Sequence, residues 1–126
     1  MAGTPFVSHV EWCVTDLARA TALLEGLFGW RFAPYGTRYR LYTPAAGGTC
    51  VGLLQVAAVQ PAATTLVHVC VDDLDAALAR ALALGARPHV APTAVPGHGR
   101  YAQVLDADGN VIGLFEATPA AAALRS

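Results

Sequence analysis

The stretch HVEWCVTDL, residues 9–17, returns later in the chain as LVHVCVDDL, residues 66–74. In both copies apolar side chains alternate with others, as on a half-buried β-strand, and an aspartate then stands where a helix can begin. The second copy follows after 57 residues, which places Cys70 on Cys13 and Asp73 on Asp16. The chain therefore carries one strand-to-helix junction twice, and this predicts a tandem duplication.

A second internal similarity joins the ends of the two halves. GGTCVGLLQVA at 47–57 resembles DGNVIGLFEA at 108–117, and it places Gly113 on Gly52. The spacing here is 61 residues against 57 at the first junction, so the second half carries about four extra residues. We expect them in a loop, APTAVPGHG at 91–99. Within this region VPGHGR at 95–100, with two glycines, a proline and His98, is the expected mobile rim.

Each half has the same predicted order of elements, βαβββ. Strand, helix and turn signals in the first half predict a strand at 7–14, a helix at 17–27 ended by Gly29, and strands near 30–35, 38–43 and 49–57. In the second half they predict a strand at 66–71, a helix at 74–84 capped by Asp72 or Asp73 and ended by Gly85, strands near 87–91, 100–105 and 111–117, and a tight turn at DADGN, 106–110.

This order predicts an α+β fold in a single domain, 1–126. Module 1 spans about 6–58, module 2 about 65–118, and the tail 119–126 is given no role. Each module has one helix and one small sheet, so by itself it would supply only half of a hydrophobic core. Two modules packed together would form a curved mixed sheet around a cleft, with the helices on the outer face.

Composition excludes several classes of function. The net charge is −1, which does not favour nucleic acid or an anionic membrane, and no apolar run approaches the ~20 residues of a membrane span. The start MAGTPF lacks the features of a signal peptide, so we expect a cytoplasmic protein. Hydrophobic residues make up 55% of the chain, above the usual ~45–50%, and together with open sheet edges this predicts a homodimer.

Two βαβββ modules with these junctions resemble the vicinal oxygen chelate superfamily, which groups glyoxalase I, extradiol dioxygenases, fosfomycin-resistance enzymes and bleomycin-binding proteins. The resemblance covers about residues 6–118. It rests on HVEWCVTDLARA with LFGW, on VCVDDLDAAL with LGA, and on PGHGRYAQVLDADGNVIGLFE, whose end matches the family pattern DPxGNxIxLxE except for Ala107 in place of proline. The order and spacing of these motifs are specific for the fold, and much less so for an activity.

The resemblance implies four metal-ligand positions, of which only one carries a donor here. In metal-dependent members a histidine lies seven residues before the capping aspartate, and His9 matches it. The other three positions hold Leu66, Gly52 and Gly113, none of which has a donor side chain. A catalytic metal site needs about three protein ligands. Glu116 does not restore the site, because an odd step from Gly113 turns it to the other face of a strand. We therefore expect no metal cofactor.

Two ways to retain chemistry remain open. His9 and Glu11 share one face of their strand, and His68 is the equivalent of Glu11 in the second half. These three side chains could together bind a divalent metal at a shifted site. They could also act without a metal in acid/base chemistry, with Glu11 or His68 as the catalytic group. The alternative is a polar wall of hydrogen-bonded side chains.

Strand alternation also assigns the faces. Trp12 and the apolar residues on the same face of its strand should pack under the helix. By resemblance to the family, Trp30 is expected to have a structural role just after the first helix. The residues expected to line the ligand-binding cleft are His9, Glu11, Cys13, His68, Cys70, Tyr101 and Phe115. Further candidates for a pocket wall are Tyr35, Tyr39 and Tyr42, and candidates to meet an anionic ligand group are Arg38, Arg40 and Arg100. The sequence thus predicts a metal-free small-molecule binding protein; the alternative is a lyase, isomerase or dioxygenase-like enzyme.

Overall fold

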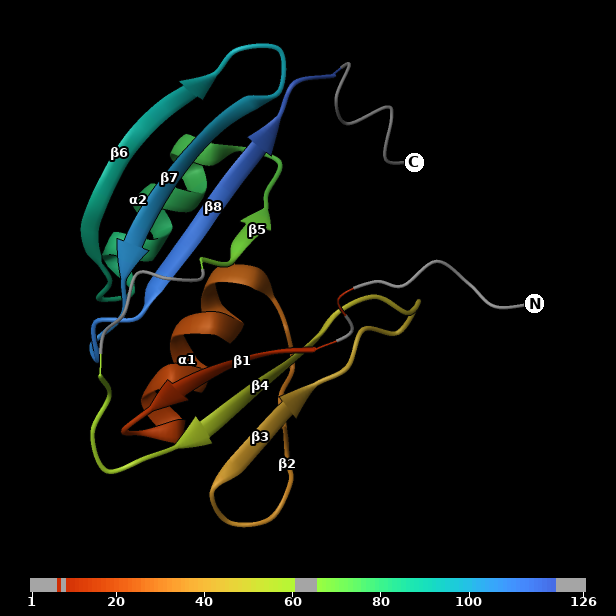
Figure 1. The fold of residues 1–126 in the computed structure, drawn as a ribbon, viewed down its shortest axis with the longest axis vertical. Helices are drawn as coiled ribbons and strands as arrows, with labels where there is room; N and C mark the ends of the chain where they lie inside the picture. The colour runs from red at the N-terminus through yellow and green to blue at the C-terminus, as the bar shows by residue number, and fades with distance from the viewer. Residues whose placement is uncertain (1–6, 8, 61–65, 120–126) are drawn as a thin grey trace. The chain divides into compact units, whose positions relative to one another are not determined.

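The chain folds into two βαβββ units, as the duplicated sequence predicts (Figure 1). The computed structural model describes residues 7, 9–60 and 66–119, in units Met1–Val59 and Gln60–Ser126. Unit 1 contains β1 (His9–Val14), α1 (Leu17–Phe28), β2 (Ala33–Pro34), β3 (Tyr39–Tyr42) and β4 (Cys50–Gln55). Unit 2 contains β5 (His68–Cys70), α2 (Leu74–Ala83), β6 (Arg87–Val95), β7 (Gly99–Leu105) and β8 (Val111–Ala117). The α+β class and the two modules are confirmed.

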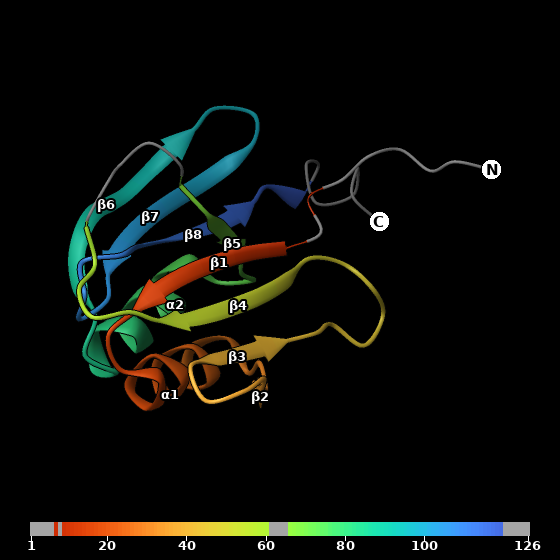
Figure 2. The same ribbon diagram turned by 60° about the horizontal axis from the view of Figure 1, so that its bottom comes forward.

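Each unit has its own four-stranded mixed sheet, and the two sheets have the same topology. The strand order is β1-β4-β3-β2 in unit 1 and β5-β8-β7-β6 in unit 2. The first and last strands of each unit pair in parallel, and the remaining pairs are antiparallel, as Figure 2 shows for unit 1. Glu11 pairs with Gly52 in the first sheet, and His68 pairs with Gly113 in the second. The register therefore confirms the internal alignment residue by residue.

Both helices begin at the aspartates that the sequence marks. The side chain of Asp16 accepts a hydrogen bond from the backbone N–H of Arg19, and Asp73, not Asp72, does the same for Ala76, both at 3.0 Å. Such caps satisfy amide groups that the helix itself leaves unpaired. Helix α1 ends at Gly29, whose φ of 73° lies in the left-handed region that glycine tolerates.

One face of each sheet packs against the helix of its own unit. Trp12 and Val14 on β1 are buried, while His9 and Glu11, at odd positions of the same strand, are exposed. The same side of β4 carries Leu53, which is 0% exposed. In unit 2 the equivalent residue is Leu114, also 0% exposed. We call the opposite side of each sheet the helix-distal face; it holds the candidate site residues.

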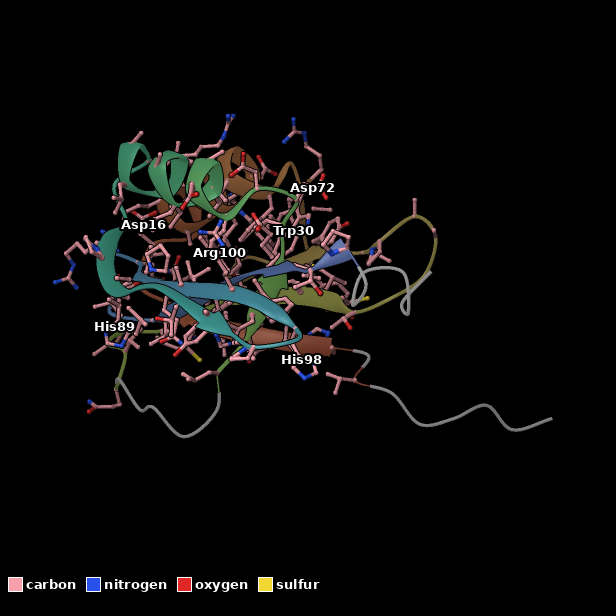
Figure 3. All side chains as sticks on the ribbon, turned by 90° about the horizontal axis from the view of Figure 1, so that it is seen from above. Asp16, Trp30, Asp72, His89, His98 and Arg100 are labelled. Atoms are coloured by element: carbon pink, nitrogen blue, oxygen red, sulfur yellow. The ribbon has the colours of Figure 1, made fainter. Side chains whose placement is uncertain are left out.

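The expected loop at 91–99 is wrong for residues 91–95, which continue a strand, and a turn between strands lies within the expected rim at 95–100. Strand β6 continues to Val95, a short turn follows, and β7 begins at Gly99, which pairs with Val95 (Figure 3 labels His98 in this turn). The extra residues of the second half lengthen this hairpin, and the pairing absorbs them through register shifts between Pro88 and Thr93. Such irregularities are how an antiparallel ladder accommodates extra residues.

Four half-buried aromatic rings gather where α1 ends: Phe28, Trp30, Phe32 and Tyr42. Trp30 stacks on Tyr42 with ring centres 5.1 Å apart, which agrees with a structural role for Trp30. Tyr42 pairs with the buried Val51 and so lies on the helix side. Its expected place on a ligand pocket was therefore wrong. Within the described part of the chain, no helix has the length and apolarity needed to span a membrane.

Candidate functional site

The helix-distal face of unit 1 brings together side chains from three strands. His9 and Glu11 come from β1, Tyr39 from β3, and Gly52 from β4 between them. Strand alternation puts all four on the same side, because Trp12 and Leu53 on the intervening positions are buried against the helix. Sequence reasoning predicted His9 and Glu11 here, and it named Tyr39 only as a possible pocket wall.

Gly52 matters because the tyrosine ring occupies the space that a side chain would need. A Cβ atom at position 52 would collide with the hydroxyl and the ring end of Tyr39, and it would lie 3.0 Å from Nε2 of His9. The phenol therefore lies directly over the glycine. Any larger residue at position 52 requires Tyr39 to move.

The Tyr39 hydroxyl contacts His9 and has Glu11 as its acidic neighbour. It lies 2.8 Å from Nε2 of His9, and the nearby Glu11 carboxylate acts on its pKa. Burial of the phenol, followed by the hydrogen bond and the negative charge of Glu11, raises the pKa of Tyr39 to about 12.

Direct contact between His9 and Glu11 is weak. Nε2 of His9 lies 4.0 Å from Oε1 of Glu11, beyond hydrogen-bond distance, and the two side chains are 43% and 38% exposed. Both side chains therefore remain accessible on the surface.

Unit 2 builds a different arrangement around the equivalent glycine. At Gly113 the space for a side chain is filled by the ring of His68, and a Cβ there would lie only 2.7 Å from the carbonyl oxygen of Val67. Nε2 of His68 lies 3.1 Å from the side-chain nitrogen of Gln103, which is buried. Tyr101 meets the histidine edge to face, with ring centres 5.7 Å apart.

The other expected cleft residues lie on the helix-distal faces of their own units. Cys13 is half-buried and pairs with Leu54, and Cys70 is exposed and pairs with Phe115. Among the described residues, neither cysteine takes part in a disulfide bond. Within either unit, the described residues include no group of three His, Cys, Asp or Glu side chains close enough to hold a metal ion.

Two arginines that were candidates for an anionic ligand lie on the helix side. Arg40 donates to the buried hydroxyl of Thr21 at 3.0 Å. Arg100 pairs with Asp75 at 3.3 Å and with Glu116 at 3.4 Å, between β7 and α2 (Figure 3). As candidates to meet an anionic ligand in the expected cleft they were therefore wrong, because their side chains pair with groups on the helix side.

Two further polar residues were named from the sequence. Arg38 was the third candidate to meet an anionic ligand group, and Glu116 was expected on the opposite face of its strand from Gly113. Arg38 donates to the carbonyl oxygen of Gln55. Glu116 accepts from the backbone N–H of Leu74 at 2.8 Å and caps α2. It therefore faces the helix, as the odd step from Gly113 predicts.

The family model described as the Glyoxalase/Bleomycin resistance protein/Dioxygenase superfamily matches residues 7–114. The chain belongs to this superfamily. A search of curated proteins gives no significant match.

Solved structures of the same fold include fosfomycin resistance proteins. FosX from Mesorhizobium loti is 26% identical, with a TM-score of 0.72, over 94% of this chain and 97% of that one. FosX from Listeria monocytogenes is 20% identical, with a TM-score of 0.77, over 98% of this chain and 100% of that one. A superfamily enzyme from Burkholderia phytofirmans is 20% identical, with a TM-score of 0.75, over 88% and 98%. The Listeria protein has also been solved with Mn(II) and sulfate.

The residues at the implied ligand positions do not fit a metal ion. Of His9, Gly52, Leu66 and Gly113, only His9 carries a donor. Its Nε2 is engaged with Tyr39, and the space over each glycine is filled by a ring. No chemical step through a metal is therefore derived for this chain.

Sequence reasoning missed two partners, the hydroxyl of Tyr39 and the amide of Gln103. The available signal was the pair of glycines at equivalent positions. A strand glycine marks a place where another group approaches closely, but the sequence does not say which ring arrives there.

Proposed function

We propose that this protein is a metal-free small-molecule binder of the glyoxalase/bleomycin resistance superfamily. One observation carries the proposal: the side-chain space at Gly52 and Gly113 is filled by the rings of Tyr39 and His68. In each unit, the glycine stands where metal-dependent relatives would have a metal-ligating side chain. The space of that side chain is filled by a ring from a neighbouring strand, and this ring has its own hydrogen-bond partner.

The polar groups of the helix-distal faces support binding of an organic ligand. Each unit combines aromatic rings with a few oriented hydrogen-bonding groups: His9, Glu11 and Tyr39 in one, and His68, Tyr101 and Gln103 in the other. Ligand sites are commonly built this way, with apolar contact area and a small number of polar groups that fix orientation. Cys13, Cys70 and Phe115 add to these faces.

The test is metal content and metal response. The protein is purified without chelator and analysed for bound metals, and its thermal stability is measured with added Zn²⁺, Ni²⁺, Mn²⁺ and Fe²⁺. We expect far less than one metal per chain and no stabilisation that His9→Ala abolishes, since a ligand that binds only the folded state raises the melting temperature. Near-stoichiometric metal that is lost in both His9→Ala and His68→Ala would overturn the proposal.

The second candidate is an enzyme that uses His9, Glu11 and His68. The neighbouring side chains of His9, Tyr39 and Glu11 favour it, because interacting titratable groups are common at active sites. Turnover of a small electrophilic or enolisable compound that is lost in Glu11→Gln but unaffected by chelator would support acid/base chemistry. Metal-dependent turnover that needs all three residues would support the shifted metal site.

A cytoplasmic homodimer is part of the proposal. Each sheet ends in edge strands, β1 and β2 in unit 1 and β5 and β6 in unit 2, and unpaired edges favour association unless they are covered. Sedimentation equilibrium should give twice the chain mass of 13.0 kDa. A monomer at all concentrations would contradict this part alone.

A further inference from the structure

On the helix-distal face of unit 1, the Glu11 carboxylate is an acceptor that a ligand can reach. The Tyr39 hydroxyl and Nε2 of His9 are engaged with each other at 2.8 Å. The Glu11 side chain is partly exposed, and its carboxylate offers two acceptor oxygens and no donor. This surface therefore matches a ligand that donates hydrogen bonds.

Aromatic rings lie next to these acceptors. Tyr35 is 72% exposed, and its ring meets Tyr39 edge to face with centres 6.3 Å apart. Its backbone N–H donates to the carbonyl oxygen of Tyr39 at 2.9 Å, which fixes the segment that carries it. The face of a tyrosine ring attracts cations through its quadrupole.

The arginine side chains of unit 1 hydrogen-bond groups other than Glu11, Tyr35 and Tyr39 in the contacts that follow. Arg31 donates to the carbonyl of Trp30, and Arg38 donates to that of Gln55. Arg19 donates to Thr15, and Arg40 donates to Thr21 on the helix side. The sequence contains no lysine. Among the described residues of unit 1, the charge next to Tyr35 and Tyr39 is thus the carboxylate of Glu11, which repels an anion.

We propose that Glu11, His9, Tyr39 and Tyr35 bind an organic cation: a protonated amine, amidine or guanidine on a flat or aromatic body. The charged N–H groups would donate to the Glu11 carboxylate, and the body would lie against Tyr35. This inference rests on the proposed function and adds the ligand class. It sets the chain apart from the Listeria FosX, which has been solved with a phosphonic acid and with sulfate.

The experiment compares three probes with one aromatic body: benzylamine, benzyl alcohol and benzylphosphonate. Amide chemical shifts of the full chain are followed in ¹H–¹⁵N spectra, with chelator present. We expect benzylamine to bind most tightly and benzylphosphonate least, with shifts centred on β1 and on the segment carrying Tyr35. Partly exposed ion pairs and cation–π contacts each correspond to about two- to fivefold in affinity.

Three variants assign the effect. Glu11→Gln should weaken benzylamine about two- to fivefold and leave benzyl alcohol unchanged. Tyr35→Ala should weaken both probes, because it removes contact area. Asp72→Asn removes the same charge at an exposed position of unit 2, and it should leave all three affinities unchanged.

The outcomes separate the two proposals. Tighter binding of benzylphosphonate, no binding of benzylamine, or benzylamine binding unaffected by Glu11→Gln would each overturn the cation site. The metal-free function would stand as long as some probe binds in chelator. Binding of every probe only after Mn²⁺ is added would instead overturn the metal-free function.

Discussion

The two units match on their helix sides and differ on their helix-distal sides. Leu53 and Leu114 occupy equivalent positions on β4 and β8, and both are fully buried. Leu17 and Leu74, each the first residue of its helix, are buried as well. On the other side, Glu11 in unit 1 corresponds to His68 in unit 2, opposite equivalent glycines. Packing against a helix restricts a residue to one size and polarity, whereas the helix-distal side leaves both open.

The equivalent glycines show what this freedom permits. Over Gly52 the filling ring is Tyr39, from the antiparallel neighbour β3; over Gly113 it is His68, from the parallel neighbour β5. Both glycines leave the same side-chain space empty. The ring that fills it lies next to a carboxylate in unit 1 and next to a buried amide in unit 2. The two helix-distal faces therefore differ in chemistry, while the leucines at the equivalent buried positions 53 and 114 are the same.

The largest expected effect tests the matching sides. Leu53→Ala and Leu114→Ala should each reduce the free energy of unfolding by about 2–5 kcal/mol, since each leaves a cavity in a fully buried position. Leu54→Ala, on the half-buried helix-distal side of the same strand, is the control and should cost less. Urea denaturation measures all three. A cost near zero at either buried leucine would mean that the two cores are not equivalent.

The second prediction tests the glycines. Gly113→Ala should destabilise by about 1–3 kcal/mol, because the new methyl group meets the His68 ring and the carbonyl oxygen of Val67, a backbone atom that cannot move alone. Gly52→Ala should cost less, since it meets the far end of Tyr39, a side chain that can turn away.

Double variants identify the cause of these costs. Tyr39→Ala should remove most of the cost of Gly52→Ala, whereas His68→Ala should remove only part of the cost of Gly113→Ala, because the backbone contact remains. Thermal or urea unfolding of the single and double variants gives the coupling energies. Strict additivity in both pairs would contradict the account of rings filling the glycine space.

The third prediction compares the helix caps. Asp16→Ala and Asp73→Ala should each cost about 0.5–2 kcal/mol, because each removes an acceptor for a helix N–H group. The cost should be larger for Asp16, since α2 keeps a second acceptor in Glu116, which holds the N–H of Leu74. Urea titration provides the ranking, and a larger loss in Asp73→Ala would reverse it.

The smallest effect on stability at neutral pH is expected at Tyr39. Tyr39→Phe should cost about 0.5–1.5 kcal/mol, the usual value of one hydrogen bond. Because folding raises the pKa of Tyr39 from 10.0 to about 12, its stabilising contribution is complete below pH 10 and is lost as the pH rises through 12. The fall in stability between pH 10 and 12 should therefore be shallower in Tyr39→Phe.

A spectroscopic titration completes this test. Absorbance of the phenolate should show one tyrosine that ionises near pH 12 in the native protein and is absent in Tyr39→Phe. Glu11→Gln should lower the pKa of Tyr39, yet keep it above 10.0, because burial is the larger cause. A late-titrating tyrosine that persists in Tyr39→Phe would show that another residue carries the effect.

Several parts of the fold could be predicted because their signals are local. The caps Asp16 and Asp73, the helix stop at Gly29 and the turn at DADGN depend on contacts within a few residues. The length of β6 could not be predicted, because its bulged pairing with β7 depends on a distant strand. The partners of Arg40 and Arg100 could not be predicted either, because Thr21 and Asp75 lie on the helices, far from the two arginines in the sequence.

For the candidate site, the sequence by itself determined the duplicated order of elements, the equivalence of Glu11 with His68, and the absence of donors at Gly52, Leu66 and Gly113. These follow from residue identity and strand alternation. Only the tertiary structure decided what replaces the missing side chains. Which ring fills the space over a glycine depends on the distances between neighbouring strands and on side-chain rotamers, and neither is encoded in a local pattern.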